Sequence, residues 1–176
     1  YVVRQMAAEF LGNLGDAAAV PHLLEALVDG SPGVRQTAAA ALGEIGDRRA
    51  VEALVHRLSD DADYVQNAAV YALGQLRDER AVAPLVTLLD NARANERKAT
   101  VVALNNIGGD GIVEPLLRCL VDESDGVKAL AAEALSSYRD ERITTALIDV
   151  VENNTFYLVL EPAAKALGAQ RERRAV

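Results

Sequence analysis

The chain contains very few of the residues that form covalent or metal cross-links. Its 176 residues include a single cysteine, Cys119, and no tryptophan. One cysteine excludes a disulfide within the chain and a zinc site made of several cysteines, so we expect the reducing environment of the cytoplasm. No stretch approaches 18 uncharged apolar residues. We therefore expect no membrane-spanning helix and no membrane partner.

Candidate catalytic residues are also scarce. Only two histidines occur, His22 and His56, whereas a metal centre needs several converging ligands. No serine or cysteine lies near a base in a recognisable motif, and the glycines form no phosphate-binding sequence. We predict no catalytic residue, no metal and no cofactor, and the sequence favours a protein that is not an enzyme.

Positive charge is in deficit. Lysine and arginine number 18 against 26 aspartates and glutamates, which gives a formal net charge of −8. Proteins that bind nucleic acids usually gather basic residues into a stripe that neutralises phosphates. Here the basic residues are spread along the whole chain, so we predict no nucleic-acid partner and a surface charge that serves solubility.

A leucine recurs at a constant interval. It stands at Leu11, Leu42, Leu73, Leu104 and Leu135, each 31 residues after the previous one. A fixed period of roughly 20 to 50 residues indicates a solenoid, in which one structural unit repeats because it cannot bury its apolar face alone.

One repeat, residues 34–64, contains two amphipathic helical patterns. The first apolar stripe comprises Val34, Ala38, Ala41, Leu42 and Ile45, and the second comprises Val51, Leu54, Val55 and Leu58. Between the stripes, Gly46 can end one helix in the left-handed conformation and Asp47 can cap the next. The repeat is therefore predicted to be two antiparallel helices.

Glycine, proline and a change of spacing give finer predictions. Glycine inside a helix costs about 1 kcal/mol relative to alanine, so we expect the neighbouring helix to approach closely at Gly12, Gly43, Gly74 and Gly168. We expect helices to bend at Pro21, Pro84 and Pro115, or to begin there after a short first turn. One residue is added near Asn153–Thr155, where we expect a bulged loop.

These residues resemble the HEAT-like repeat of the phycobilisome-lyase type. The motif of that family, VR-x-x-AA-x-ALG-x-IGD followed by AV-x-x-L, is present as Val34-Arg35, Ala38-Ala39, Ala41-Leu42-Gly43, Ile45-Gly46-Asp47, Ala50-Val51 and Leu54. The resemblance covers essentially the whole chain. It implies an all-α, armadillo-like fold: an α-α superhelix of about five antiparallel helix hairpins, with partial repeats at both ends.

The resemblance also implies two unlike faces. Helices of the type that covers residues 51–58, here called A helices, lie on the convex side, and those of the type that covers residues 34–46, the B helices, line the concave side. A ladder is implied as well, in which an acidic residue at the end of an A helix pairs with a basic residue six positions later, as at Asp29 with Arg35 and Asp122 with Lys128. Asp60 meets Gln66 instead, so the ladder is incomplete.

We expect one solenoid domain over residues 1–176, as a fragment of a longer array. The last four residues, from Arg173 to Val176, repeat the sequence Arg48-Arg49-Ala50-Val51, where a new A helix is expected to start. The open ends of such an array allow end-to-end self-association.

Some positions that vary between repeats are predicted to point into the concave groove. Near the middle, Tyr71, Val102 and Leu130 form an apolar spot with Asn67, Gln75, Lys98 and Asn106 around it. An aromatic residue in an apolar centre with a polar rim is typical of interface hot spots. The alternative is that Tyr71 packs against the adjacent B helix and that Val102 covers it.

We therefore predict a non-enzymatic scaffold that binds a protein or peptide partner on the concave face of its B helices. The family resemblance allows an alternative, a subunit of a bilin lyase or isomerase that handles a chromophore. HEAT-type deoxyhypusine hydroxylases are recognised by paired His-Glu steps, and neither His22 nor His56 is followed by glutamate.

Overall fold

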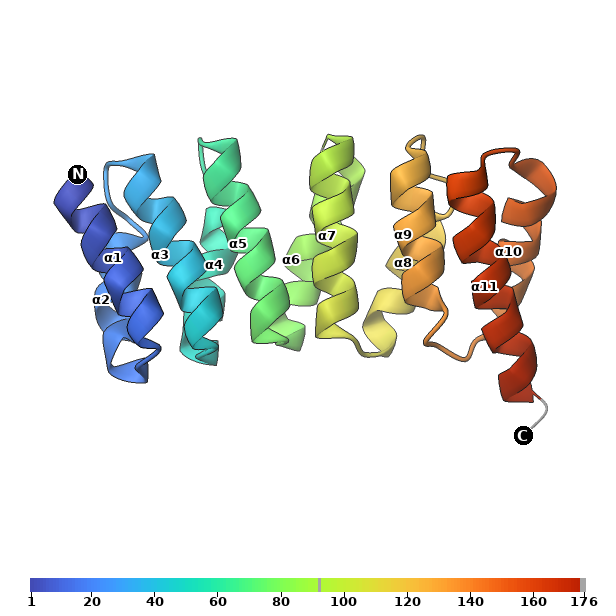
Figure 1. Ribbon diagram of the computed structural model, residues 1–176, viewed down its shortest axis with the longest axis horizontal. Coiled ribbons are helices and arrows are strands. Elements are labelled where there is room, and N and C mark those ends of the chain that lie inside the picture. Colours follow the sequence, from blue (N-terminus) through green and yellow to red (C-terminus); the bar gives the residue numbers. More distant parts are fainter. Residues whose placement is uncertain (92, 175–176) are drawn as a thin grey trace. The chain divides into compact units, whose positions relative to one another are not determined.

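The computed structural model describes residues 1–91 and 93–174, without the side chains of residue 91 and of residues 171–174. In this part of the chain all regular structure is helical. The elements are α1 (Val2–Leu14), η1 (Ala17–Ala19), α2 (Val20–Ala26), α3 (Pro32–Ile45), η2 (Arg48–Ala50), α4 (Val51–Arg57), α5 (Asp63–Leu76), η3 (Glu79–Ala81), α6 (Val82–Asn91), α7 (Ala94–Ile107), η4 (Asp110–Ile112), α8 (Val113–Cys119), α9 (Asp125–Leu135), α10 (Glu141–Asn153) and α11 (Tyr157–Arg174), where η denotes a short 3-10 helix. Figure 1 shows their order along the chain.

Helix pairs repeat along the chain as the sequence predicts. Even-numbered helices from α2 to α10 are A helices, and odd-numbered helices are B helices. Gly46 ends α3 with φ of 76°, and the carboxylate of Asp47 then accepts the backbone N–H of Arg49 at 2.9 Å. Asp78 accepts the N–H of Arg80 in the same way. The predicted end of one helix and start of the next are confirmed, and the fold is an all-helical solenoid.

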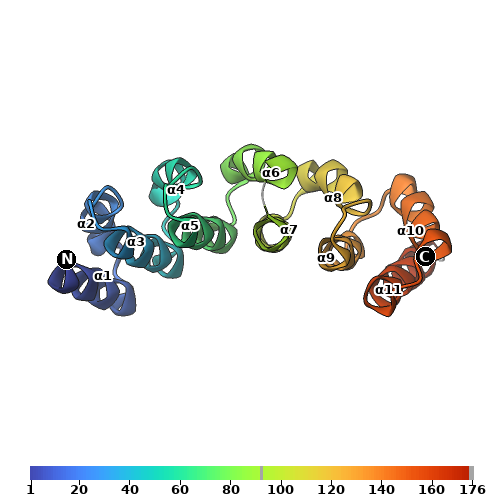
Figure 2. The ribbon, with the colours of Figure 1, turned by 90° about the horizontal axis from the view of Figure 1, so that it is seen from above.

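The chain divides into two compact units, Tyr1–Thr87 and Leu88–Val176, with the boundary inside α6. Within unit 1, α1, α3 and α5 form one layer and α2 and α4 form another (Figure 2). Within unit 2, α7, α9 and α11 form one layer, and α8 and α10 form the other (Figure 2).

Four of the five recurring leucines lie in the core, and Leu11 is half-buried. Leu42, Leu73, Leu104 and Leu135 are completely buried. Alanine and valine on both helices of each pair complete the core, and burial of these apolar side chains is the main stabilising contribution to the fold. Each repeat therefore depends on its neighbour for most of its stability.

Close helix contacts explain two of the interior glycines. A Cβ atom on Gly12 would lie 2.7 Å from the Cβ of Ala41, and one on Gly43 would lie 2.8 Å from the Cα of Ala72. Both distances are shorter than a carbon–carbon contact allows, so the prediction is confirmed at these two glycines. It is wrong at Gly168, where nothing lies within 4 Å of the corresponding position.

The prolines lie at the starts of A helices. Pro21 is the second residue of α2, and Pro84 and Pro115 are the third residues of α6 and α8. A 3-10 turn precedes each of these helices, so the predicted short first turn is confirmed. The missing N–H of proline costs little in the first turn of a helix.

Two predicted details near the C-terminal end differ from the structure. The residue added near Asn153 lengthens α10, which is 13 residues long, and the loop that follows is short and not bulged. The new helix expected at Arg173 and Arg174 is absent, because α11 continues through Arg174. Residues 175 and 176 lie outside the described residues.

Candidate functional site

The candidate site lies on the B helices. We define the B-helix face of unit 1 as the surface of α1, α3 and α5 that points away from the A helices. The B-helix face of unit 2 is the corresponding surface of α7, α9 and α11 (Figure 2). The seven residues of the predicted site divide between these two faces. Asn67, Tyr71 and Gln75 belong to unit 1, whereas Lys98, Val102, Asn106 and Leu130 belong to unit 2.

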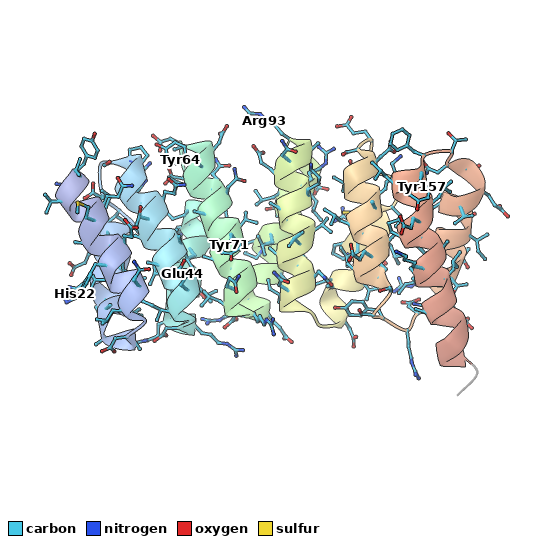
Figure 3. All side chains as sticks on the ribbon, viewed as in Figure 1. His22, Glu44, Tyr64, Tyr71, Arg93 and Tyr157 are labelled. Atoms are coloured by element: carbon cyan, nitrogen blue, oxygen red, sulfur yellow. The ribbon has the colours of Figure 1, made fainter. Side chains whose placement is uncertain are left out.

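In unit 1, α5 presents an exposed aromatic ring between two amides. Tyr71 is 57% exposed, and Asn67 and Gln75, one turn before and one turn after it, are exposed too. Figure 3 shows Tyr71 on α5 and Glu44 on α3 on the side of unit 1 that carries the B helices. An exposed ring with polar neighbours has the character of an interface anchor.

In unit 2, α7 carries a similar row. Val102 is 43% exposed and Asn106 is exposed, one turn later. Lys98 is half-buried because its methylene chain lies over the start of α9, where a Cβ on Gly126 would be 3.1 Å from the lysine Cδ. Leu130 on α9 is half-buried. The structure therefore brings Lys98, Val102 and Asn106 onto one helix face.

Amide side chains form two rows on the B-helix face of unit 1. One row contains Gln5, Gln36 and Asn67, and in the other Asn13 and Gln75 lie on either side of Glu44. Between the rows lie mostly small or apolar side chains: Met6, Thr37, Ala40, Ala68 and Tyr71. An amide side chain both donates and accepts hydrogen bonds, so such rows can satisfy the backbone N–H and C=O groups of a bound polypeptide.

A shallow pocket of about 380 Å³ lies between α9 and α11 on the B-helix face of unit 2. It is lined by Glu133, Ser136, Glu161, Pro162, Lys165, Ala166 and Ala169. The Lys165 ammonium lies 2.6 Å from a Glu161 carboxylate oxygen. This hydrogen bond and the attraction between the two charges raise the pKa of Lys165, so the pocket holds a charged pair.

Arginines near the starts of α1, α3 and α7 pair with the loops that follow A helices. The Arg35 guanidinium donates to both carboxylate oxygens of Asp60, at 2.8 and 2.6 Å, and to the backbone oxygen of Asp29 at 2.9 Å. The acidic side chain is thus 25 residues after the arginine, whereas the family ladder implied the acid six residues before it. Arg4 with Asp29 and Arg97 with Asp122 follow the same rule.

Lys128 does not follow this rule. Its ammonium pairs with Asp125 at 2.7 Å, whereas the family ladder implied a pair with Asp122. In the pair of Arg35 and Asp60, burial disfavours the charged form of Asp60. Hydrogen bonds from Arg35 and from the Ala62 N–H outweigh this effect and lower the pKa of Asp60 to about 2. The ion pairs of Arg35 with Asp60 and of Arg97 with Asp122 are largely shielded from solvent, whereas the Arg4 side chain of the Arg4–Asp29 pair is 60% exposed.

A second set of ion pairs lies at the opposite ends of the B helices, and the sequence predictions missed it. Arginine follows a capping aspartate by two residues in Asp47-Arg48-Arg49, Asp78-Glu79-Arg80 and Asp140-Glu141-Arg142. Each arginine donates to its own aspartate. Arg142 also reaches Glu114 of the previous repeat at 2.6 Å. The recurring Asp-x-Arg spacing is the signal that could have revealed these pairs.

The described histidine, cysteine and carboxylate side chains do not form a cluster of the kind that holds a metal ion. His22 and His56 are both exposed on A helices. Among the described residues, no three or more His, Cys, Asp or Glu side chains gather so that they could hold a metal ion. Burial raises the pKa of the Cys119 thiol to about 11. Over residues 1–91 and 93–174, no helix is both long enough and apolar enough to cross a membrane.

Comparison with known proteins agrees with this geometry. The family model for HEAT repeats matches residues 1–73, 20–105 and 92–168. No curated protein sequence matches the chain. The complex of CpcE and CpcF of phycocyanin lyase from Nostoc sp. PCC7120 is similar in structure, with a TM-score of 0.66 and 25% identity over 98% of this chain and 83% of that chain.

A designed armadillo repeat protein in complex with the peptide (KR)4 has a TM-score of 0.69 and 23% identity, over 94% of this chain and 91% of that chain. Human deoxyhypusine hydroxylase in complex with glycerol has a TM-score of 0.52 and 22% identity, over 97% of this chain and 80% of that chain. At these two identities, the likeness shows the shared fold alone.

Proposed function

The chain belongs to the HEAT-repeat family, and from this premise we infer that it is a non-enzymatic scaffold that binds an extended segment of a partner protein on its B-helix faces. The observation that carries this inference is the exposed Tyr71 ring between the exposed amides of Asn67 and Gln75. Buried aromatic anchors contribute much of the affinity of protein interfaces, and a ring that is exposed in the free protein is available for this role.

The proposed contact residues are the three of unit 1 and the four of unit 2. They are Asn67, Tyr71, Gln75, Lys98, Val102, Asn106 and Leu130. The amide rows of unit 1 add backbone recognition, because an extended peptide has unpaired N–H and C=O groups along its length. The peptide complex of the designed armadillo protein supports the idea that a solenoid of this kind can hold a peptide. We place the scaffold in the cytoplasm, where its single thiol stays reduced.

The test is selection from a phage-displayed library of random linear peptides, followed by fluorescence anisotropy with the selected peptides. We expect Tyr71→Ala or Val102→Glu to raise the Kd by about tenfold or more, since truncation of an anchor typically costs over 1 kcal/mol. Because both side chains are exposed, helicity and Tm should change little.

Two exposed valines outside the B-helix faces provide matched controls. Val28 is 73% exposed and Val121 is 85% exposed, each after an A helix. Val28→Ala and Val121→Glu should leave the Kd unchanged. Equal affinity of the wild-type protein and the Tyr71→Ala and Val102→Glu variants for every selected peptide would contradict the proposed function.

Chromophore handling is the second candidate function, and the similarity to the CpcE and CpcF complex favours it. If this protein handles a bilin, mixing the two should shift the visible absorbance of the bilin, either directly or when an acceptor protein is added. A spectrum that stays the same in both mixtures would count against this candidate and leave the scaffold proposal in place.

A further inference from the structure

The B-helix face of unit 1 carries negative charge without compensating positive charge. We propose that it binds a polypeptide segment with basic side chains, an inference that rests on the proposed function and specifies the chemistry of the partner. Its basis is the distribution of ion pairs over α1, α3 and α5.

These three helices contain two basic residues, Arg4 and Arg35. Arg4 pairs with Asp29 at 2.6 Å, and Arg35 pairs with Asp60 at 2.6 Å. Each arginine is therefore matched by an aspartate of a loop that follows an A helix, so the two pairs add no net positive charge to the B-helix face.

Glu9 on α1 and Glu44 on α3 are both exposed. Among the described residues, neither carboxylate takes part in an ion pair, whereas Asp47, which follows α3, and Asp60 and Asp78, which flank α5, are all paired with arginines. The B-helix face of unit 1 therefore presents two carboxylates and attracts cations.

Glu44 borders the line along which α1 and α3 touch, here called the α1–α3 seam, and Glu9 is an exposed residue of α1 about one turn before Gly12. The two helices are in close contact at Gly12 and Ala41. A Glu44 carboxylate oxygen lies 3.5 Å from the position of a Cβ on Gly12, so this side chain reaches back across the seam toward α1. Glu9 lies one turn before Asn13 on α1. Both carboxylates are exposed, so a lysine or arginine side chain can approach them from solvent.

Tyr71 provides a further contact for a cation on α5. A guanidinium or ammonium over the face of a tyrosine ring is attracted by the ring quadrupole. Packed helices are roughly 8–10 Å apart, and an extended peptide rises roughly 3.3 Å per residue. A segment that crosses the B helices therefore advances about three residues per helix, so basic residues at every third position match the spacing of the face.

The B-helix face of unit 2 differs in charge. Among the side chains described there, Lys98 on α7 and Lys165 on α11 bring positive charge beside the negative charge of Glu133 and Glu161. A basic segment should therefore prefer unit 1. This internal contrast separates a specific site from the general attraction between a cationic peptide and a protein with a net charge of −8.

The experiment uses two fluorescein-labelled nonapeptides with glycine and serine at most positions. One has arginine at every third position, and the other has glutamate there. Anisotropy titrations compare the wild-type protein with the double variant Glu9→Gln/Glu44→Gln and with the matched control Glu25→Gln/Glu79→Gln. The control removes two exposed carboxylates of unit 1 that lie outside the B-helix face.

We expect the arginine peptide to bind and the glutamate peptide not to bind. The Kd of the arginine peptide should rise about fivefold in Glu9→Gln/Glu44→Gln, as for the loss of two partly exposed ion pairs, and change less than about twofold in the control. Equal losses in both double variants would overturn the proposal, because net charge alone would then explain the binding.

The library selection separates this proposal from the function on which it rests. Selected peptides enriched in lysine and arginine, with affinity that depends on Glu9 and Glu44, support both. Selected peptides that need Tyr71 but are indifferent to Glu9→Gln/Glu44→Gln overturn the basic-segment proposal and leave the scaffold function standing. If no selected peptide depends on Tyr71 or Val102, the scaffold function itself fails.

Discussion

Gly43 and Gly168 occupy equivalent positions in their repeats but have different surroundings. A Cβ on Gly43 would contact the backbone of α5 at 2.8 Å, whereas a Cβ on Gly168 would meet nothing within 4 Å. The helix propensity of glycine is low at both positions, so only the neighbouring helix distinguishes them. At the residue scale, a single methyl group therefore decides how closely two B helices pack.

Alanine at these two positions should have opposite effects on stability. Gly43→Ala forces α3 and α5 apart, and we expect it to lower the free energy of unfolding by about 1–3 kcal/mol, as overpacking does. Gly168→Ala should raise it by about 1 kcal/mol, because alanine favours the helix and the site has room. Urea titrations followed by circular dichroism measure both changes. A stabilised Gly43→Ala variant would show that α3 and α5 are not in close contact.

At the scale of elements, two kinds of ion pair stabilise opposite ends of the helix hairpins. One joins an arginine near the start of a B helix to an aspartate 25 residues later, and the other is the Asp-x-Arg pair. Asp60 and Asp78 illustrate the two kinds, and both have a pKa lowered to about 2. In Asp60, hydrogen bonds from Arg35 and Ala62 overcome the effect of burial. In Asp78, the hydrogen bond from Arg80 is the largest cause. Both aspartates therefore stay charged in the folded protein well below the pH at which they take up a proton in the unfolded chain.

Stability should consequently fall at acid pH. A carboxyl group with a lowered folded pKa contributes its full stabilisation above its unfolded pKa, and this contribution is lost as the pH falls through the folded value. For Asp60 the window runs from about pH 4 to about pH 2, and the loss is on the order of 2 kcal/mol. Urea unfolding at several pH values measures it. Asp60→Asn should be less stable at pH 7 and should show a weaker pH dependence, and an unchanged slope in this variant would contradict the assignment.

The sequence predicts where the helices begin and end, but it does not predict which residues of different repeats pair with one another. The helix end at Gly46 and the cap at Asp47 follow from local chemistry, because both involve residues close in the chain. The pairing of Arg35 with Asp60 does not, since it joins residues 25 apart that only the stacked repeats bring together. The length of α10 could not be predicted for a related reason. One added residue can lengthen either a helix or a loop, and the packing of the helix decides which.

On the scale of the whole molecule, two compact units each have a buried leucine from the same column. Leu73 lies in unit 1 and Leu135 in unit 2, and both are completely buried. In a solenoid each repeat is stabilised mainly by its immediate neighbours. Replacement of one of these leucines should therefore destabilise the helices of its own unit more than the helices of more distant repeats.

Leu73→Asp buries a charge and should remove hydrogen-exchange protection from α3 and α5, while α9 and α11 retain most of theirs. Leu135→Asp should show the reverse pattern, and each variant is the control for the other. Hydrogen exchange read by mass spectrometry resolves the two patterns. Uniform loss of protection over all helices in both variants would show instead that the chain unfolds as one cooperative unit.

The candidate site could be only partly predicted. The repeat columns identified outward positions such as Tyr71 and Val102, and both side chains are exposed. The charge of the B-helix face could not be counted from the sequence, because Arg4 and Arg35 lie on the same helices as Glu9 and Glu44. Only the pairing of both arginines with aspartates leaves those glutamates uncompensated.

The burial of Cys119 has a practical consequence. Its thiol has a pKa raised to about 11 by burial, so at pH 7 very little of it is present as the reactive thiolate. A maleimide dye should therefore leave the native protein almost unlabelled. A cysteine introduced by Tyr71→Cys, exposed to solvent, would take up the dye selectively, so its fluorescence would report occupancy of the surface without replacement of the natural cysteine.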